Sequence, residues 1–236
     1  MNKYEIVQKI EKFAPLETQE KWDCSGWGVN LRGVNSSGVN SSGVNGVNVE
    51  KIMFALTVTD DVVRQAKAKG CDMIISHHPL FFVPLEYKDI NIYSAHTNFD
   101  LAEGGTTDTL IKKLGFTKTK NEGFVRIVEL ETPIKTEDLR EKLLKISPKL
   151  RYVNNKNIKE IKTIGFCAGS GSEFISETKT DAFVTGDLKF HTALDSEQVV
   201  FDIGHFESEI FAPERLKEIT EVGERGIIAD EKSPFI

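Results

Sequence analysis

The sequence has few cysteines, few histidines and no long apolar run. Its three cysteines are scattered and form no CxxC spacing, which excludes a thiolate metal site and fits a reducing compartment. No apolar run approaches the length of a membrane span, and the mixed charged and apolar N-terminus predicts no signal peptide. We therefore expect a cytoplasmic protein without a membrane partner.

Positive charge is also in short supply. Lys and Arg number 30 against 36 Asp and Glu, which gives a net charge of −6. This balance argues against a broad surface for nucleic acid or anionic lipid, so we expect no nucleic-acid partner. The remaining composition, with 39% hydrophobic and 28% charged residues in a chain of 236, is ordinary for a soluble protein of one large or two small domains.

Strand and helix patterns alternate along the chain. The spacing of Ile6, Ile10 and Phe13 predicts a first helix that ends before Pro15. The later alternation predicts an α/β fold with largely parallel sheets. Predicted strands lie at 51–58, 72–76, 91–95, 124–131, 161–169, 181–188 and 198–204, and predicted helices at 3–13, 60–70, 106–115, 136–147, 172–179 and 205–220.

The pattern restarts near Asn121, which predicts a second α/β domain. We place the first domain at 1–121, completed by 196–236, and the inserted second domain at 122–195. An internal repeat, GVNSS-GVNSS-GVN-GVN, occupies residues 33–48. Its unit is too short for a solenoid turn, and its Gly, Asn and Ser predict a flexible surface loop.

All five histidines fall at or just beyond the C-terminal end of a predicted strand. His77 and His78 follow DMIIS, His96 follows IYSA, His191 lies beyond VTGDL, and His205 follows VVFDIG. In open α/β sheets that edge is where ligands bind. Adjacent residues on a strand point to opposite faces, so the pair His77 and His78 could converge only at a strand end.

Imidazoles and carboxylates in this pattern indicate a metal site. Asp100 follows His96 by four residues, and His205 and Glu209 share one face of a helical turn. Such ligands suit zinc, iron, manganese or nickel, and together with His77 and His78 they are enough for two ions. The alternatives are a satisfied HHP loop pair, a chance HxxxE spacing, a His96 that only orients a ligand, and a merely polar His191.

Four blocks of the sequence, SHHPLFFVPL, AHTNFD, TGDLKFH and DIGHFESE, resemble the signature blocks of the NIF-three-like (YbgI-like) proteins. That family is also known as GTP cyclohydrolase I type 2 homologues. The segment EKWDCSGWGVNL resembles its Trp-Asp-Gly motif, although Cys24 and Ser25 stand where an Asn-Val pair is common.

The resemblance implies two related α/β domains, the second inserted into the first, with a dinuclear metal cleft between them, and a homohexameric ring. Zinc is the first expectation for the two divalent transition metal ions, with iron, manganese or nickel as alternatives. The implied metal ligands are His77, His78, Asp100, His205 and Glu209.

A metal pair that lowers the pKa of a water from ~15.7 towards ~7 favours hydrolysis. The family name suggests GTP, which with water would give dihydroneopterin triphosphate and formate after attack at C8 of guanine. The alternatives are a dimetal hydrolase of another substrate, such as a phosphoester, and a non-catalytic metal-binding or regulatory scaffold. The candidate acid–base groups are His96 and His191, and the candidate phosphate ligands are Lys189 and the turn Gly169, Ser170 and Gly171 at a predicted helix start.

Overall fold

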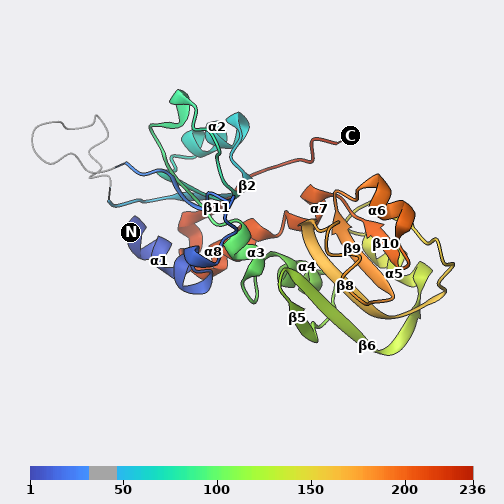
Figure 1. Ribbon diagram of the computed structural model, residues 1–236. Coiled ribbons are helices and arrows are strands. Elements are labelled where there is room, and N and C mark those ends of the chain that lie inside the picture. Colours follow the sequence, from blue (N-terminus) through green and yellow to red (C-terminus); the bar gives the residue numbers. More distant parts are fainter. Residues whose placement is uncertain (32–46, 236) are drawn as a thin grey trace, which may run out of the picture. The chain divides into compact units, whose positions relative to one another are not determined.

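The computed structural model describes residues 1–31 and 47–235, which divide into two compact units of mixed α/β structure (Figure 1). Unit 1 comprises Met1–Ala102 and Ala212–Lys232, and unit 2 comprises Glu103–Phe211 and Ser233–Ile236. The second unit is thus inserted into the sequence of the first. Most of the repeat that was predicted as a surface loop, up to Gly46, lies outside the described residues. Within the described ranges, no helix has the length and apolarity that crossing a membrane requires.

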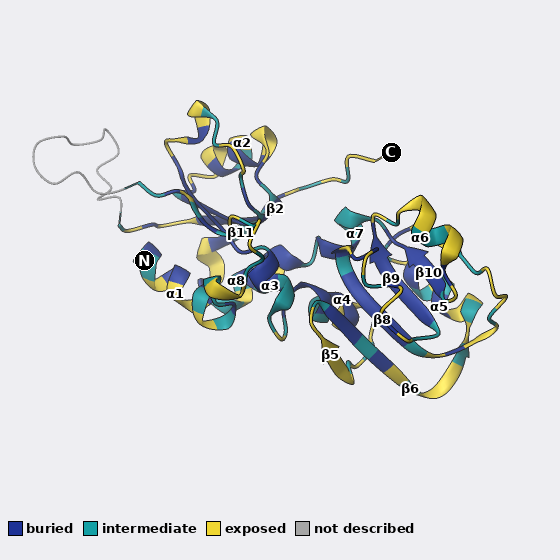
Figure 2. Ribbon diagram, viewed as in Figure 1, coloured by how far each residue is buried: buried dark blue, intermediate teal, exposed yellow. Residues whose placement is uncertain are grey.

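A largely parallel sheet forms the centre of unit 1. The strands are β1 Gly26–Val29, β2 Ile52–Thr57, β3 Met73–His78, β4 Asn91–Ser94 and β11 Gly226–Ile228. Their order is β1-β4-β3-β2-β11, and all neighbours run parallel except β1 and β4. The central strands β2, β3 and β4 are buried almost throughout (Figure 2), as expected for parallel strands with both faces covered.

Helices cover both faces of this sheet. Alternate residues of β2 serve different cores: Phe54 packs in the same cluster as Ile10 and Leu216, whereas Met53 packs with Val62. The α-helices of unit 1 are α1 Lys3–Phe13, α2 Asp60–Ala68, α3 Thr97–Leu101 and α8 Ala212–Thr220, with short 3-10 turns η1 Leu16–Thr18, η2 Leu85–Tyr87 and η3 Gly223–Arg225.

Unit 2 has a mixed sheet. Its strands are β5 Lys120–Glu122, β6 Val125–Lys135, β7 Arg151–Val153, β8 Glu160–Ser170, β9 Ala182–Gly186 and β10 Val199–Asp202, in the order β5-β6-β8-β9-β10-β7. Strand β9 pairs in parallel with β8 and β10, whereas the outer pairs are antiparallel. The predicted parallel character therefore holds at the centre of the sheet and not at its edges. The α-helices are α4 Thr106–Lys113, α5 Thr136–Leu144, α6 Phe190–Asp195 and α7 His205–Glu209.

The observed unit boundaries differ from the predicted ones. Strand β10 falls in the range 196–236 that was predicted to complete the first domain, yet it pairs in parallel with β9 and therefore belongs to unit 2. Helix α4, expected in the first domain, also lies in unit 2, where Leu110 packs with Ile164 and Phe201. Both elements were misplaced because neither strand pairing nor core membership is visible in the local pattern.

Two predicted helices also differ from the structure. Residues 172–177 form turns, with the Phe174 amide donating to the Gly171 carbonyl, and the buried Ser172 hydroxyl bonds to the loop after β9. The single helix predicted over 205–220 is broken between Glu209 and Ala212. Pro213 has no N–H to donate to Glu209, so it sits in the first turn of a new helix.

Candidate functional site

In unit 1 the histidines gather at the C-terminal edge of two neighbouring strands. Ser76 of β3 is paired with Ser94 of β4 in parallel, so residues two positions further along each strand reach the same edge. His78 is the last residue of β3, and His96 is the N-cap of α3. This register brings His78 and His96 to the same strand edge, whereas His191 and His205 belong to unit 2.

Three imidazoles come together there. The ring centroids lie 5.1 Å apart for His77 and His78, 5.2 Å for His77 and His96, and 5.5 Å for His78 and His96. Each ring offers one nitrogen, and these three nitrogens lie within 4.8 Å of one another. The sequence prediction treated His96 only as an acid–base group or as a residue that orients a ligand, whereas its position is also compatible with metal ligation.

The adjacent rings of His77 and His78 are aligned by opposite neighbours of β3. His77 Nδ1 donates to the carbonyl oxygen of Ala95, 2.8 Å away beyond β4. His78 Nδ1 lies 2.7 Å from Thr57 Oγ1 on β2. Because each Nδ1 is bonded to a residue on a neighbouring strand or just beyond it, Nε2 is the nitrogen that each ring directs elsewhere. This arrangement lets two adjacent residues of one strand serve the same edge.

Asp100 approaches the same histidines from α3. One of its carboxylate oxygens, Oδ1, lies 3.4 Å from His77 Nε2. Its side chain is 18% exposed, and that of His77 is fully buried. The structure thus places three of the predicted ligands of unit 1, namely His77, His78 and Asp100, around one edge of the sheet.

Sequence reasoning missed the partner of His96. His96 Nδ1 donates to Asp23 Oδ1 at 3.0 Å, and Asp23 also accepts hydrogen bonds from the Thr97 amide and hydroxyl. Burial alone would raise the pKa of Asp23, but the bonds from Thr97 and His96 outweigh it and hold the pKa at about 2. Burial, with the neighbouring His77, lowers the pKa of His96. The sequence feature that could have identified this partner is the Trp22-Asp23 pair of the segment EKWDCSGWGVNL, which resembles a family motif but was assigned no role.

In unit 2, helix α7 carries two further predicted ligands, His205 and Glu209. His205 Nε2 lies 3.0 Å from Glu209 Oε2, as the i,i+4 spacing predicts. The Glu209 side chain is 4% exposed. The hydrogen bond to Glu209, supported by the nearby Asp187, raises the pKa of His205 to about 10 against the opposing effect of burial. The two carboxylates therefore favour positive charge at this position, and a bound cation would supply the same charge.

Gly169 leaves the space that Glu209 occupies. A Cβ built on Gly169 would collide with Glu209 Oε1 and would lie 3.7 Å from His205 Cε1. The Gly169 amide donates to Ser208 Oγ at 2.9 Å, and Ser208 Oγ donates to the His205 carbonyl. The turn after β8 therefore positions α7, and its glycine is required by close packing as well as by a φ of 69°.

The predicted phosphate ligands are placed differently from the expectation. The amides of Gly169 and Gly171 already donate to hydroxyls, the latter to Thr185 Oγ1 at 2.8 Å. The turn leads into further turns rather than a helix, so the predicted support from a helix N-terminus is wrong. Ser170 and Lys189 are exposed. Phosphate binding by these residues stays a prediction, and no helix N-terminus supports it.

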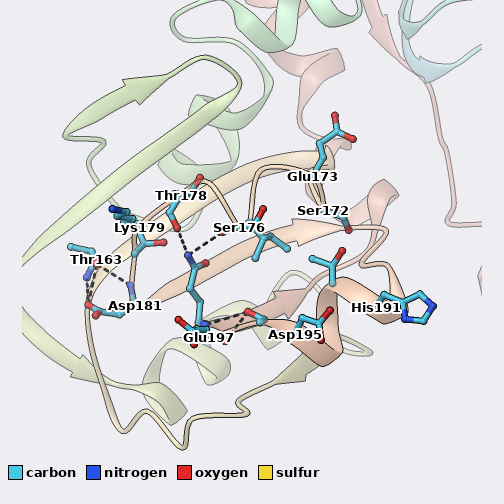
Figure 3. Close-up of a pocket in the computed structure, with 15 residues that line it drawn as sticks. Thr163, Ser172, Glu173, Ser176, Thr178, Lys179, Asp181, His191, Asp195 and Glu197 are labelled. Carbon is cyan, nitrogen blue, oxygen red and sulfur yellow. Dashed lines mark hydrogen bonds between the residues drawn. The ribbon is translucent and has the colours of Figure 1, made fainter.

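His191 lies on α6 and lines a cavity of about 750 Å³ (Figure 3). Its neighbours in that cavity are mostly hydroxyl and carboxylate side chains, among them Thr192 and Asp195. Neither His205 nor Glu209 is among the residues that line it. The acid–base role predicted for His191 stays a prediction.

The residues present fit a divalent transition metal. They supply imidazole-nitrogen and carboxylate donors, which zinc and similar borderline ions prefer, and Glu209 sits in a space that a side chain at Gly169 would fill. In addition, the Nδ1 atoms of His77, His78, His96 and His205 are all bonded to oxygen atoms. Metal-binding histidines are oriented in this way by their second nitrogen.

Comparisons with known proteins agree over nearly the whole chain. The family model Duf34/NIF3 (NGG1p interacting factor 3) matches residues 1–226. A Clostridium perfringens protein named GTP cyclohydrolase 1 type 2 homolog is 33% identical, with 98% of this chain and 97% of that protein covered. A Campylobacter jejuni protein of the same name is 30% identical over the same shares.

Solved structures share the fold. A protein titled ybgI, of unknown function, superposes with a TM-score of 0.83 at 22% identity, covering 99% of this chain and 100% of that one. A hypothetical protein of Staphylococcus aureus gives a TM-score of 0.79 at 23% identity, covering 100% of this chain and 99% of that one.

Proposed function

The chain belongs to the DUF34/NIF3 family, and from this premise we propose that it is a hydrolase that depends on two divalent metal ions. The observation that carries the proposal is the common orientation of His77, His78 and His205: Nδ1 of each of these rings is bonded to an oxygen atom, so Nε2 is the nitrogen in position to bind an ion. Packing alone does not require the same choice of nitrogen in every ring.

Each unit carries its own group of proposed ligands. In unit 1, Ala95 and Thr57 orient the two rings at the end of β3, and Asp100 brings negative charge to them. In unit 2 a single helical turn presents an imidazole and a buried carboxylate. The proposed ligands of the two ions are His77, His78, Asp100, His205 and Glu209.

Divalent ions, when bound, supply Lewis acidity and a water that ionises near neutral pH. The remaining chemistry falls to side chains. His96, whose lowered pKa keeps the ring neutral near pH 7, can accept a proton at Nε2 while Asp23 holds Nδ1 and stabilises the resulting imidazolium. We assign to His96 the role of an acid–base group, which takes this proton from the substrate and later returns it.

The substrate we propose is GTP, since the relatives that are 33% and 30% identical to the chain are named GTP cyclohydrolase 1 type 2 homologs. One GTP and one water would give dihydroneopterin triphosphate and formate. Attack of water at C8 of guanine, opening of the imidazole ring and loss of formate precede rearrangement of the ribose and closure of the new ring. Zinc is the first expectation for the ions because the donors combine imidazole with carboxylate.

A turnover assay tests the reaction. The full chain, loaded with zinc or manganese, is incubated with GTP, and formate and oxidised fluorescent pterin are measured beside a chelator-treated sample. Formate and pterin together support the proposal. Release of phosphate alone indicates a dimetal phosphoester hydrolase. No turnover of GTP, GDP or ATP by metal-loaded protein contradicts a hydrolase and favours a metal-binding or regulatory scaffold.

The homohexameric assembly and the cytoplasmic location are proposals as well. Sedimentation of the purified chain tests the first, since a hexamer of 26.4 kDa chains separates clearly from a monomer. Fractionation of cells tests the second.

A further inference from the structure

Asp187 is a charged residue of the TGDLKFH block, and neither the sequence analysis nor the proposed ligand set gives it a role. It follows β9 directly, as His205 follows the neighbouring strand β10 after a short turn. Thr185 of β9 is paired in parallel with Asp202 of β10. Asp187 and His205, which follow these two residues, therefore reach the same edge of the sheet. There Asp187 Oδ2 lies 2.6 Å from His205 Nδ1.

The backbone at Asp187 is unfavourable for any residue with a side chain. Its φ is 50°, in the left-handed region that glycine adopts without strain. The conformation is held from outside, because Ser172 Oγ donates to the Asp187 carbonyl and accepts from the Lys189 amide. Glycine adopts this φ without strain, so a glycine variant can remove the carboxylate without adding backbone strain.

The effect of the Asp187 carboxylate is visible at the imidazole ring of His205, which it contacts. A carboxylate accepts hydrogen bonds, so His205 donates through Nδ1 and its Nε2 faces Glu209, 3.0 Å away. The main chain after β9 also lies close to the start of α7, because a Cβ at Gly186 would lie 2.7 Å from the His205 amide nitrogen. The short segment between β9 and α6 therefore packs closely enough on α7 to control the imidazole.

We propose that Asp187 is a positioning residue of the metal centre, which holds the His205 ring so that Nε2 and the Glu209 carboxylate can bind one ion. The inference rests on the proposed function only in assuming that His205 and Glu209 are metal ligands. It requires no particular substrate. Partners of this type typically change metal affinity by about 10- to 100-fold when they are removed.

The decisive variant is Asp187→Gly, because glycine removes the carboxylate and also relieves the left-handed backbone. Zinc affinity of the full, metal-stripped chain is measured by competition with a chromogenic chelator, and thermal unfolding is followed without metal. We expect zinc affinity to fall by about 10- to 100-fold while the metal-free protein still unfolds in one cooperative transition. Asp187→Asn, which keeps an acceptor oxygen without the charge, should lose less affinity.

Asn157→Gly is the matched control. Asn157 is another non-glycine residue of unit 2 with a left-handed backbone, at a φ of 55°, and its amide donates to the Asn154 carbonyl rather than to any part of α7. It should retain wild-type zinc affinity. Equal zinc affinity of Asp187→Gly and wild type would overturn the inference, as would an equal loss in Asn157→Gly. Wild-type protein that binds zinc but turns over no GTP would refute the proposed reaction and leave this comparison intact.

Discussion

Gly169 and Glu209 are packed so closely that a Cβ on the glycine would collide with the carboxylate oxygen Oε1. The glycine belongs to the end of β8 and the carboxylate to α7. The contact therefore joins the backbone of the sheet to a proposed metal ligand, and it makes the ligand position sensitive to one methyl group.

Gly169→Ala should lower both metal affinity and stability. The methyl group must displace the Glu209 carboxylate, and alanine is also strained at a φ of 69°. Gly123→Ala is the control: Gly123 has a φ of 60°, and a Cβ added there would meet no heavy atom of the described residues within 4 Å, so it reports the strain alone. We expect Gly169→Ala to lose at least about 1 kcal/mol more than the control in urea unfolding. Equal losses, with metal affinity intact, would show that Glu209 is not held there.

Asp23 should make the stability of the protein depend on acid pH. Its pKa is about 2 when folded against 3.8 as the ordinary value, so its contribution is complete above about pH 4 and is lost as the pH falls through 2. The difference corresponds to about 2 kcal/mol. In urea titrations, the stability gap between wild type and Asp23→Asn should shrink from about pH 6 to about pH 2.5. A gap that does not change with pH would contradict the assigned protonation.

His205→Ala should remove metal from the protein. We expect its zinc affinity to fall by more than about 100-fold, beyond the effect of losing an orienting partner. His191→Ala is the control, because His191 lies in a cavity that none of the proposed ligands lines. Metal analysis after dialysis against defined free zinc measures both variants. Retention of wild-type metal content by His205→Ala would exclude it from the ligand set.

Thr57→Val should weaken metal binding with little loss of stability. Valine has the shape of threonine but cannot bond to His78 Nδ1, which lies 2.7 Å from the hydroxyl. Zinc affinity should fall by about tenfold, and Thr57→Ser, which restores a hydroxyl, should recover most of it. Chelator competition compares the variants. If serine and valine behave alike, the hydroxyl does not orient the ring.

Most local elements were predicted correctly because local forces decide them. The helix over 3–13 forms as predicted, since Asn2 caps it and its apolar residues share one face. The strand predicted over 72–76 is likewise observed, but it extends through His77 and His78 instead of ending before them. The helix predicted over 172–179 is not formed, and residues 172–177 are turns. The break before Pro213 could have been inferred from proline chemistry.

The candidate site was predictable as a set of ligand types and not as a set of interactions. Histidines at strand ends identified the edge, because parallel neighbours deliver their C-terminal residues together. The partners Asp23 and Asp187 were missed, since nothing in a local window connects a carboxylate with an imidazole 73 or 18 residues away.

Periodicity and residue type act over short stretches, and for that reason they were enough to establish the elements, the strand edge and the chemical character of its side chains. Three features emerged only from the folded arrangement: which nitrogen of each imidazole is held, where β10 and α4 belong, and why Gly169 must lack a side chain. These features depend on distances of a few ångströms between segments that are far apart in the chain.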